Sequence, residues 1–255
     1  MIVGTSHFDG AVAILGLARS GLAAARALIA GGNQVLAWDD SRERREDAAR
    51  AGIPLQSGAT FDWRDIAALV PSPGIPLDHP IIASARAAGI EIVGDVELLW
   101  RAMAERNFIG ITGTNGKSTT TALIGHILER ARQTVQVGGN LGTPALSLEA
   151  LWAEGSYVLE MSSFQLDLTR HMSFDIAVLL NIAPDHLDRH GNMATYTAAK
   201  QNIFRSPRLK TAIVGIDGPD TLRIYNELRQ RNGLNVVPIA TGRRLLDGVA
   251  ANGGL

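Results

Sequence analysis

Cysteine is absent from this 255-residue sequence, which excludes disulfide bonds and thiolate metal sites and is compatible with a reducing, cytoplasmic location. An excess of charge of one sign is also missing, because 24 lysine and arginine residues face 25 aspartate and glutamate residues. A chain with a formal net charge of −1 has no overall field that would attract nucleic acid or an anionic membrane. We therefore expect neither as a partner, and any anion-binding site must be local.

Aromatic residues and long apolar runs are scarce as well. Aromatic residues make up 5% of the chain, and the four tryptophans are scattered, so we expect them in packing and not in a platform that stacks bases. The most apolar stretch, residues 11–30, contains Arg19 and Arg26 and predicts a strand, a turn and a helix instead of a membrane span. With 46% hydrophobic and 19% charged residues, the composition is that of a folded globular protein.

Short apolar runs alternate with helical patterns along the chain, which predicts an α/β fold with open, mostly parallel sheets. We expect one domain over residues 1–95 and a second over residues 96–255. The expected strands are 11–15, 35–38, 91–93, 108–112, 134–137, 157–161, 176–181 and 211–214, and the expected helices are 22–29, 80–88, 95–105, 119–130, 195–204 and 220–231. The chain stops at residues 251–255 where another element is expected, which we interpret as a truncation.

The strongest motif is GITGTNGKST at residues 110–119, a glycine-rich turn between an expected strand and an expected helix. In such a turn, backbone N–H groups converge on phosphate and the helix N-terminus adds positive potential. Lys117 supplies a charge for the β- and γ-phosphates of ATP, and the Ser118 hydroxyl can bind Mg²⁺. Ile111 stands where the standard G-x-x-x-x-G-K-[ST] pattern has its first glycine, so a plain turn with an exposed lysine is the alternative. The expected ATP-binding residues are Gly113, Thr114, Asn115, Gly116, Lys117, Ser118 and Thr119.

Charged residues follow two of the later expected strands. Glu160 ends an apolar strand, where a buried carboxylate is costly unless it is paired or bound to a metal ion, so it is a natural ligand for the Mg²⁺ of ATP. Asp185 and His186 follow residues 176–181, and open α/β sheets bind ligands at the carboxyl ends of their strands. The alternatives are an exposed acid at the strand end and a structural histidine. Further candidates in the same turn are Asp188, Arg189 and His190.

The N-terminal segment carries a weaker pattern. Residues 16–21 follow a strand and open a helix, but Ala18 replaces the second glycine of the dinucleotide fingerprint G-x-G-x-x-G. Asp39 lies at the end of the next strand, near the usual acidic position, and the loop 72–75 accompanies it. A fortuitous turn is the alternative here, and also for the glycine loop 138–142 that follows another strand.

Taken together, the loop 110–119, EMSSFQL at 160–166, NIAPDHLDRH at 181–190 and AAK at 198–200 resemble the Mur ligase and folylpolyglutamate synthase superfamily. That superfamily joins a carboxylate to an amine at the expense of ATP. The SSFQL and DHLDRH stretches resemble its D-glutamate-adding branch, and the resemblance covers nearly the whole chain. It implies a Rossmann-like UDP-substrate-binding domain over 1–95 and a P-loop-type central ATPase domain over 96–255, which is incomplete. A third, C-terminal domain for the incoming amino acid would be absent.

The resemblance also implies roles for individual residues. It makes Lys117, Glu160, His186 and Lys200 catalytic. Two Mg²⁺ sites would use Ser118, Glu160, His186 and Lys200, the last as a CO₂-derived carbamate, which forms from a neutral amine and is favoured by burial. The substrate-binding residues would be Arg19, Ser20, Asp39, Asp40, Ser72, Gly74, Asn140, Ser162, Gln165 and His186.

The implied reaction belongs to peptidoglycan precursor synthesis in a cytoplasmic, monomeric enzyme. ATP phosphorylates the terminal carboxylate of UDP-N-acetylmuramoyl-L-alanine, and the amine of D-glutamate attacks the acyl phosphate. One alternative is a sister ligase that adds another amino acid. A second is a dinucleotide-dependent oxidoreductase, which leaves the Lys117 loop unexplained. A third is a catalytically inactive fragment that binds a nucleotide or a UDP-sugar.

Overall fold

The computed structural model describes residues 2, 8–140, 142–152, 154–242 and 244–251. Residues 252–255, part of the chain end that we interpreted as a truncation, lie outside these ranges. The chain divides into two compact units, and neither is one continuous stretch of sequence. The first consists of Met1–Ala104, Gly142–Ala150 and Leu168–Met172, and the second of Glu105–Leu141, Leu151–Asp167 and Ser173–Leu255. The expected boundary after residue 95 had assigned residues 96–104 and the two later segments of the first unit to the second domain.

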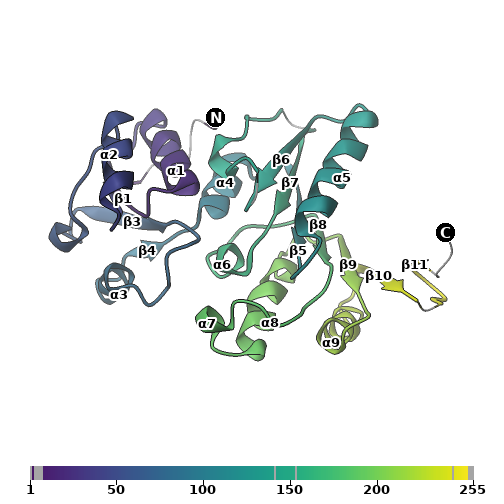
Figure 1. The fold of residues 1–255 in the computed structure, drawn as a ribbon. Coiled ribbons are helices and arrows are strands. Elements are labelled where there is room, and N and C mark those ends of the chain that lie inside the picture. The colour runs from purple at the N-terminus through teal and green to yellow at the C-terminus, as the bar shows by residue number, and fades with distance from the viewer. Residues whose placement is uncertain (1, 3–7, 141, 153, 243, 252–255) are drawn as a thin grey trace. The chain divides into compact units, whose positions relative to one another are not determined.

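The first unit is built on a parallel sheet with the strand order β2-β1-β3-β4, of which Figure 1 labels β1, β3 and β4. Its strands are β1 (Ala11–Leu15), β2 (Val35–Trp38), β3 (Ile66–Pro71) and β4 (Glu91–Ile92). Its helices are α1 (Arg19–Ala30), α2 (Arg42–Arg50), α3 (Pro80–Ala87) and α4 (Asp95–Met103), with short 3₁₀ turns η1 (Gly58–Thr60) and η2 (Ala145–Ser147). Because β2 and β3 flank β1 on opposite sides, the chain reverses direction across the sheet at the carboxyl end of β1. Ligands of open α/β sheets bind at such a point.

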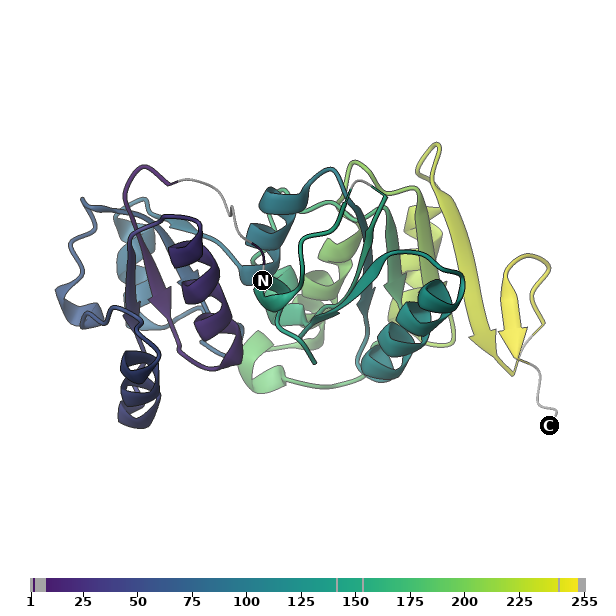
Figure 2. The ribbon, with the colours of Figure 1, turned by 90° about the horizontal axis from the view of Figure 1, so that it is seen from above.

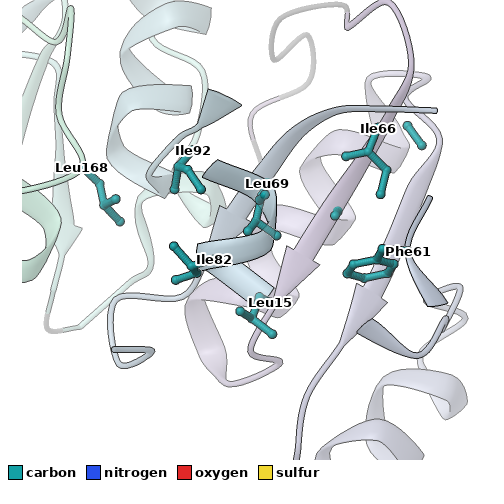
Figure 3. Packing of buried hydrophobic residues seen from close by; sticks show 10 residues of the cluster. Leu15, Phe61, Ile66, Leu69, Ile82, Ile92 and Leu168 are labelled. Atoms are coloured by element: carbon teal, nitrogen blue, oxygen red, sulfur yellow. The ribbon is translucent and has the colours of Figure 1, made fainter. Parts of the chain in front are cut away.

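The core of this unit lies between the sheet and α3. Leu15, Leu69 and Ile82 are almost completely buried there, and Figure 3 shows them with Ile92 and Leu168 in one cluster. Leu168 belongs to the short segment Leu168–Met172, so a residue far along the chain completes the core of the first unit.

A buried carboxylate fixes the same segment. The side chain of Glu97, on α4, is 0% exposed and accepts hydrogen bonds from the backbone N–H groups of Arg170, His171 and Met172 at 2.9–3.2 Å. Arg101 Nε lies 3.4 Å from the same carboxylate. A fully buried carboxylate is stable only with such partners. These hydrogen bonds therefore hold α4 and residues 168–172 together.

The second unit has a seven-stranded parallel sheet in the order β11-β10-β9-β8-β5-β7-β6. The strands are β5 (Asn107–Thr112), β6 (Val135–Gly139), β7 (Ser156–Glu160), β8 (Ile176–Leu179), β9 (Thr211–Gly215), β10 (Asn235–Thr241) and β11 (Val249–Ala251). The helices are α5 (Lys117–Arg130), α6 (Ser163–Leu166), α7 (Leu187–His190), α8 (Met193–Gln201) and α9 (Pro219–Leu228), with a 3₁₀ turn η3 (Asn202–Phe204). Figure 2 shows α5 on one face of this sheet and α8 and α9 on the other.

The central strand of this sheet is β5, between β8 and β7. After β5 the chain moves through α5 to β6, at one edge, and later moves from β8 to β9 in the opposite direction. The carboxyl end of β5 is therefore the second point where the chain reverses direction across a sheet, and the glycine loop begins there. The α/β fold class with parallel sheets is confirmed. Within the described residues, no helix has the length and apolar character needed to span a membrane.

Candidate functional site

The loop at residues 113–116 connects β5 to α5 and has the geometry of a phosphate-binding turn. Gly116 precedes the helix with a φ of 82°, a left-handed conformation that favours glycine. The first turn of α5 therefore begins without a side-chain cap, so its N–H groups face the loop. Unpaired N–H groups and the helix dipole together favour an anion at this position.

Asn181 holds this loop from the neighbouring strand. Its Oδ1 accepts hydrogen bonds from the N–H groups of Thr114 and Asn115 at 3.1 and 2.8 Å, and its Nδ2 donates to the Asn115 carbonyl at 3.0 Å. The residue follows β8, which pairs with β5, so the sheet brings it beside the loop. Asn181 was not predicted as a site residue, although its place after a neighbouring strand was a usable signal.

Two lysines meet at the loop. Lys117 Nζ donates to the Thr114 carbonyl at 2.8 Å, and Lys200 Nζ donates to the Gly113 carbonyl at 2.8 Å. Lys200 is only 2% exposed, and burial, followed by the nearby Lys117 charge, lowers the pKa of Lys200 from 10.5 to about 7. The carboxylates of Glu160 and Asp185 act in the opposite direction on this pKa. An amine with such a pKa is largely neutral slightly above pH 7, unlike an exposed lysine.

Glu160 is buried at the end of β7, 3% exposed, next to the loop that follows β6. Its Oε1 accepts a hydrogen bond from Asn140 Nδ2 at 2.9 Å. The pairing of Gly139 with Glu160 in the sheet sets this contact, because Asn140 follows Gly139 directly. A carboxylate with one neutral amide partner keeps lone pairs that a hard cation can share.

His186 and its neighbours occupy the turn after β8. His186 has a φ of 50°, an exposed ring 5.1 Å from Phe164, and its Nε2 lies 3.4 Å from Asp185 Oδ2. Asp188 is exposed, whereas His190 is buried and bonded through Nε2 to Ser163 Oγ at 2.9 Å. Of the three further candidates in this turn, His190 therefore has a packing role, and Arg189 lies over the Phe164 ring at 3.9 Å.

The donor set fits Mg²⁺ bound together with a nucleotide. Within the described ranges, no three His, Asp or Glu side chains gather as a metal site. Ser118, which is exposed in the first turn of α5, and the buried Glu160 offer two oxygen ligands. A carbamate on Lys200 would offer a further oxygen ligand. Magnesium commonly takes one or two carboxylates and completes its shell with phosphate oxygens and water. Ser118 and Glu160 are therefore chemically suitable oxygen ligands, with phosphate oxygens required to complete the set, whereas metal binding by the His186 nitrogen and by Lys200, which needs the carbamate, stays a prediction.

A cavity of about 400 Å³ lies beside the loop. Its walls include Asn115 and Gly116 of the loop and the apolar side chains of Leu180 and Ile239, with Asp217 among the polar ones. Small-molecule sites combine apolar walls and a few polar groups in this way. The cavity extends the phosphate loop into a site with room for a nucleotide.

Ser162 and Gln165 have a local structural role. Ser162 Oγ accepts a hydrogen bond from the Gln165 N–H, and Gln165 Oε1 accepts one from the Ser162 N–H, which is a capping box at the start of α6. Contact of either side chain with a substrate stays a prediction, as it does for Asn140.

In the first unit, three loops follow the neighbouring strands β1, β2 and β3. The Asp39 carboxylate, 4% exposed, accepts hydrogen bonds from the N–H groups of Leu17 at 2.6 Å and Ser41 at 2.8 Å. Ser72 Oγ donates to the Gly16 carbonyl at 2.8 Å. Asp39 and Ser72 therefore hold the loops of the predicted UDP site together, and because both are buried, little of either side chain is accessible to a ligand.

The other predicted residues of this site are more accessible. Arg19 is exposed and donates to the Gly142 carbonyl, and Ser20 is half-buried beside it in the first turn of α1. Gly74 is exposed. The Asp40 carboxylate accepts a hydrogen bond from Trp38 Nε1 at 3.1 Å and lies 3.2 Å from His79 Nε2, and these two bonds, that of His79 first, lower the pKa of Asp40.

Comparison with known proteins matches both units to one family. The family model of the Mur ligase middle domain matches residues 111–244, and that of the Mur ligase MurD-like N-terminal domain matches residues 10–94. A UDP-N-acetylmuramoylalanine–D-glutamate ligase from Phenylobacterium zucineum is 47% identical over 100% of this chain and 57% of its own length. The protein of that name from Rhodospirillum rubrum is 50% identical over 93% of this chain and 52% of its own. The chain thus spans about half the length of these curated relatives.

Solved structures agree at the level of the fold. A ligase from Neisseria meningitides that acts on UDP-N-acetylmuramate and a tripeptide containing diaminopimelate has a TM-score of 0.61 at 16% identity, covering 94% of this chain and 82% of its own. A UDP-N-acetylmuramate-alanine ligase from Thermotoga maritima has a TM-score of 0.57 at 22% identity. The match covers 93% of this chain and 53% of the ligase. Since the middle-domain match extends over more than half of the chain and contains Glu160, His186 and Lys200, the chain belongs to the Mur ligase family.

Proposed function

We propose that this chain is the UDP-substrate-binding and ATP-binding part of a ligase that adds D-glutamate to UDP-N-acetylmuramoyl-L-alanine. The observation that carries the proposal is the burial of Lys200 against the Gly113 carbonyl of the phosphate loop. A buried lysine with a lowered pKa is costly and persists where its chemistry is used. Relatives at 47–50% identity bear the name of this activity.

In this proposal, the phosphate loop orients ATP for attack by the substrate carboxylate. The N–H groups of the first turn of α5 and the Lys117 ammonium bind the phosphates. Ser118 and Glu160 would hold one Mg²⁺, and His186 and the Lys200 carbamate would hold a second, for which Glu160 is a further candidate ligand. The two ions would supply positive charge that offsets the repulsion between a carboxylate and a phosphoryl group. D-Glutamate then displaces phosphate from the acyl phosphate.

Carbamylation of Lys200 is part of the proposal and has an electrostatic argument. The Lys117 charge lies close enough to lower the pKa of Lys200, so two ammonium groups repel one another at the loop. Loss of the Lys200 proton removes the second positive charge, and attack of the neutral amine on CO₂ with release of a further proton gives a carbamate with one negative charge. The product attracts Lys117 and a metal ion instead of repelling them.

The UDP end of the substrate is assigned to the three loops of the first unit. Asp39 and Ser72 hold these loops together, as their hydrogen bonds indicate. Arg19, Asp40 and Gly74 are exposed and remain for the uridine and its phosphates. Asn140, Ser162 and Gln165 are proposed to contact the diphosphate or sugar from the second unit. The proposal also includes a monomeric, cytoplasmic enzyme.

Calorimetry with this chain tests the proposal. We expect UDP-N-acetylmuramoyl-L-alanine to bind more tightly than UDP-N-acetylmuramic acid, with no binding of NAD, because Ala18 replaces the second glycine of the dinucleotide fingerprint. Preference for the unextended muramic acid would point to the ligase that adds the first amino acid. Binding of NAD alone would overturn the assignment of the first unit.

A further inference from the structure

Tyr196 is buried on α8 directly beside the phosphate loop. It lies one helical turn before Lys200, so both side chains leave the same face of the helix. The residue is 1% exposed. Its ring lies under Lys200 Nζ, 4.7 Å from the nitrogen to the ring centroid, and its hydroxyl lies 3.2 Å from Thr114 Oγ1. Tyr196 was not among the predicted site residues.

Thr114 Oγ1 has two hydrogen-bond partners besides the Tyr196 hydroxyl. It accepts from the Ala183 N–H at 2.9 Å and lies 3.2 Å from the Ala183 carbonyl, to which it can donate. A hydroxyl has one proton and two lone pairs, so Thr114 Oγ1 has room for a third partner. The Tyr196 hydroxyl fills this place at 3.2 Å and completes the hydrogen bonding of a loop residue.

The ring of Tyr196 is also fixed on its other side. The His190 ring lies 5.2 Å from it and is stacked on Phe164 at 5.3 Å. His190 Nε2 is bonded to Ser163 Oγ at 2.9 Å, at the start of α6. With its ring packed between His190 and Lys200, Tyr196 can place its hydroxyl in few positions.

We propose that Tyr196 is a positioning residue of the ATP site, which fixes the phosphate loop through its hydrogen bond to Thr114. The inference rests on the proposed function of the loop as the ATP site. Thr114 and Asn115 are bound from the β8 side by Asn181, and Tyr196 adds a contact from α8. A loop held from two sides loses less conformational freedom when it binds a ligand, so its affinity is higher.

Calorimetric titration of the whole chain with Mg·ATP tests this role. Tyr196→Phe removes the hydroxyl and keeps the ring, and we expect it to weaken binding by roughly three- to tenfold, the usual effect of one hydrogen bond. Tyr157→Phe is the matched control. Tyr157 is a buried tyrosine of the same unit, on β7, and its hydroxyl accepts a hydrogen bond from the Leu151 N–H at 3.1 Å. This control should lower the thermal midpoint comparably and change the affinity by less than about twofold.

A second variant tests whether Tyr196 acts through Thr114. Thr114→Val removes the hydroxyl that Tyr196 contacts. By itself it should weaken the binding of Mg·ATP, whether or not Tyr196→Phe folds well. Adding Tyr196→Phe to Thr114→Val should then have almost no further effect on affinity. Full additivity of the two, an unchanged affinity in Tyr196→Phe, or an equal loss in Tyr157→Phe would each overturn the inference. Failure of the unsubstituted chain to bind Mg·ATP would refute the proposed function itself, and the inference with it.

Discussion

Replacing Lys200 by methionine should change the pH dependence of stability in a defined direction. Burial and the Lys117 charge lower the pKa of Lys200 from 10.5 to about 7, so the folded chain releases a proton that the unfolded chain keeps up to about pH 10.5. Between these values the unfolded state binds more protons, and the free energy of unfolding of the unsubstituted chain rises with pH. Below pH 7 both states are protonated, and the folded state carries the full cost of a buried ammonium. Methionine has a similar length and does not titrate.

The size of the effect follows from the same shift. One pKa unit corresponds to about 1.4 kcal/mol, so the unsubstituted chain should gain roughly 2 kcal/mol relative to Lys200→Met between pH 7 and pH 9. Urea unfolding followed by circular dichroism measures the difference, in buffers free of CO₂ so that no carbamate forms. Lys210→Met is the control, because the Lys210 side chain is 72% exposed. The difference in free energy of unfolding between the unsubstituted chain and Lys200→Met should rise from pH 7 to pH 9. A difference that stays constant or falls over this range would refute the reasoning.

Three further substitutions, with Gly74→Ala as the control for one of them, test the loops and the connection between α4 and residues 168–172. Glu97→Gln replaces a carboxylate that accepts hydrogen bonds from three backbone N–H groups. We expect urea unfolding to show that the free energy of unfolding falls by roughly 1–3 kcal/mol. An unchanged midpoint would contradict the role given to Glu97. Gly21→Ala would place Cβ 1.8 Å from the Gly16 carbonyl oxygen, and it should lower the free energy of unfolding by roughly 1–3 kcal/mol in the same assay. Gly74→Ala has no atom within 4 Å of its Cβ and should leave the free energy of unfolding almost unchanged. Asn181→Ala should weaken Mg·ATP binding at least about tenfold, because it removes several hydrogen bonds to the loop, and calorimetry that finds the affinity unchanged would show that the loop keeps its shape without them.

Much of the fold could be predicted because the strands of parallel sheets are short apolar runs. The expected strands 11–15 and 108–112 correspond to β1 and β5 almost residue for residue. β10 was missed because Pro238 interrupts its apolar pattern, and proline inside a sheet is rare. The division into two noncontiguous units could not be predicted, because it depends on which sheet and helices later segments pack against.

The site was predictable where a residue follows a strand. Lys117, Glu160 and His186 were singled out in this way: Glu160 is the last residue of β7, Lys117 begins α5 after β5, and His186 precedes α7 after β8. Their roles in catalysis stay predictions. Lys200 was expected from resemblance alone, since nothing in a helical lysine marks it as buried. Tyr196 lies on the same face of α8 as Lys200. No local pattern in the sequence predicts that its hydroxyl contacts Thr114, 82 residues earlier.

The interleaved course of the chain has a consequence for synthesis on the ribosome. The first unit needs Leu168 for its core and the N–H groups of residues 170–172 for the Glu97 carboxylate. Until Met172 has left the exit tunnel, Glu97 lacks the partners that make its burial tolerable. By then β5, α5, β6 and β7 have already been translated. The N-terminal unit therefore cannot complete its folding before much of the second unit has been translated.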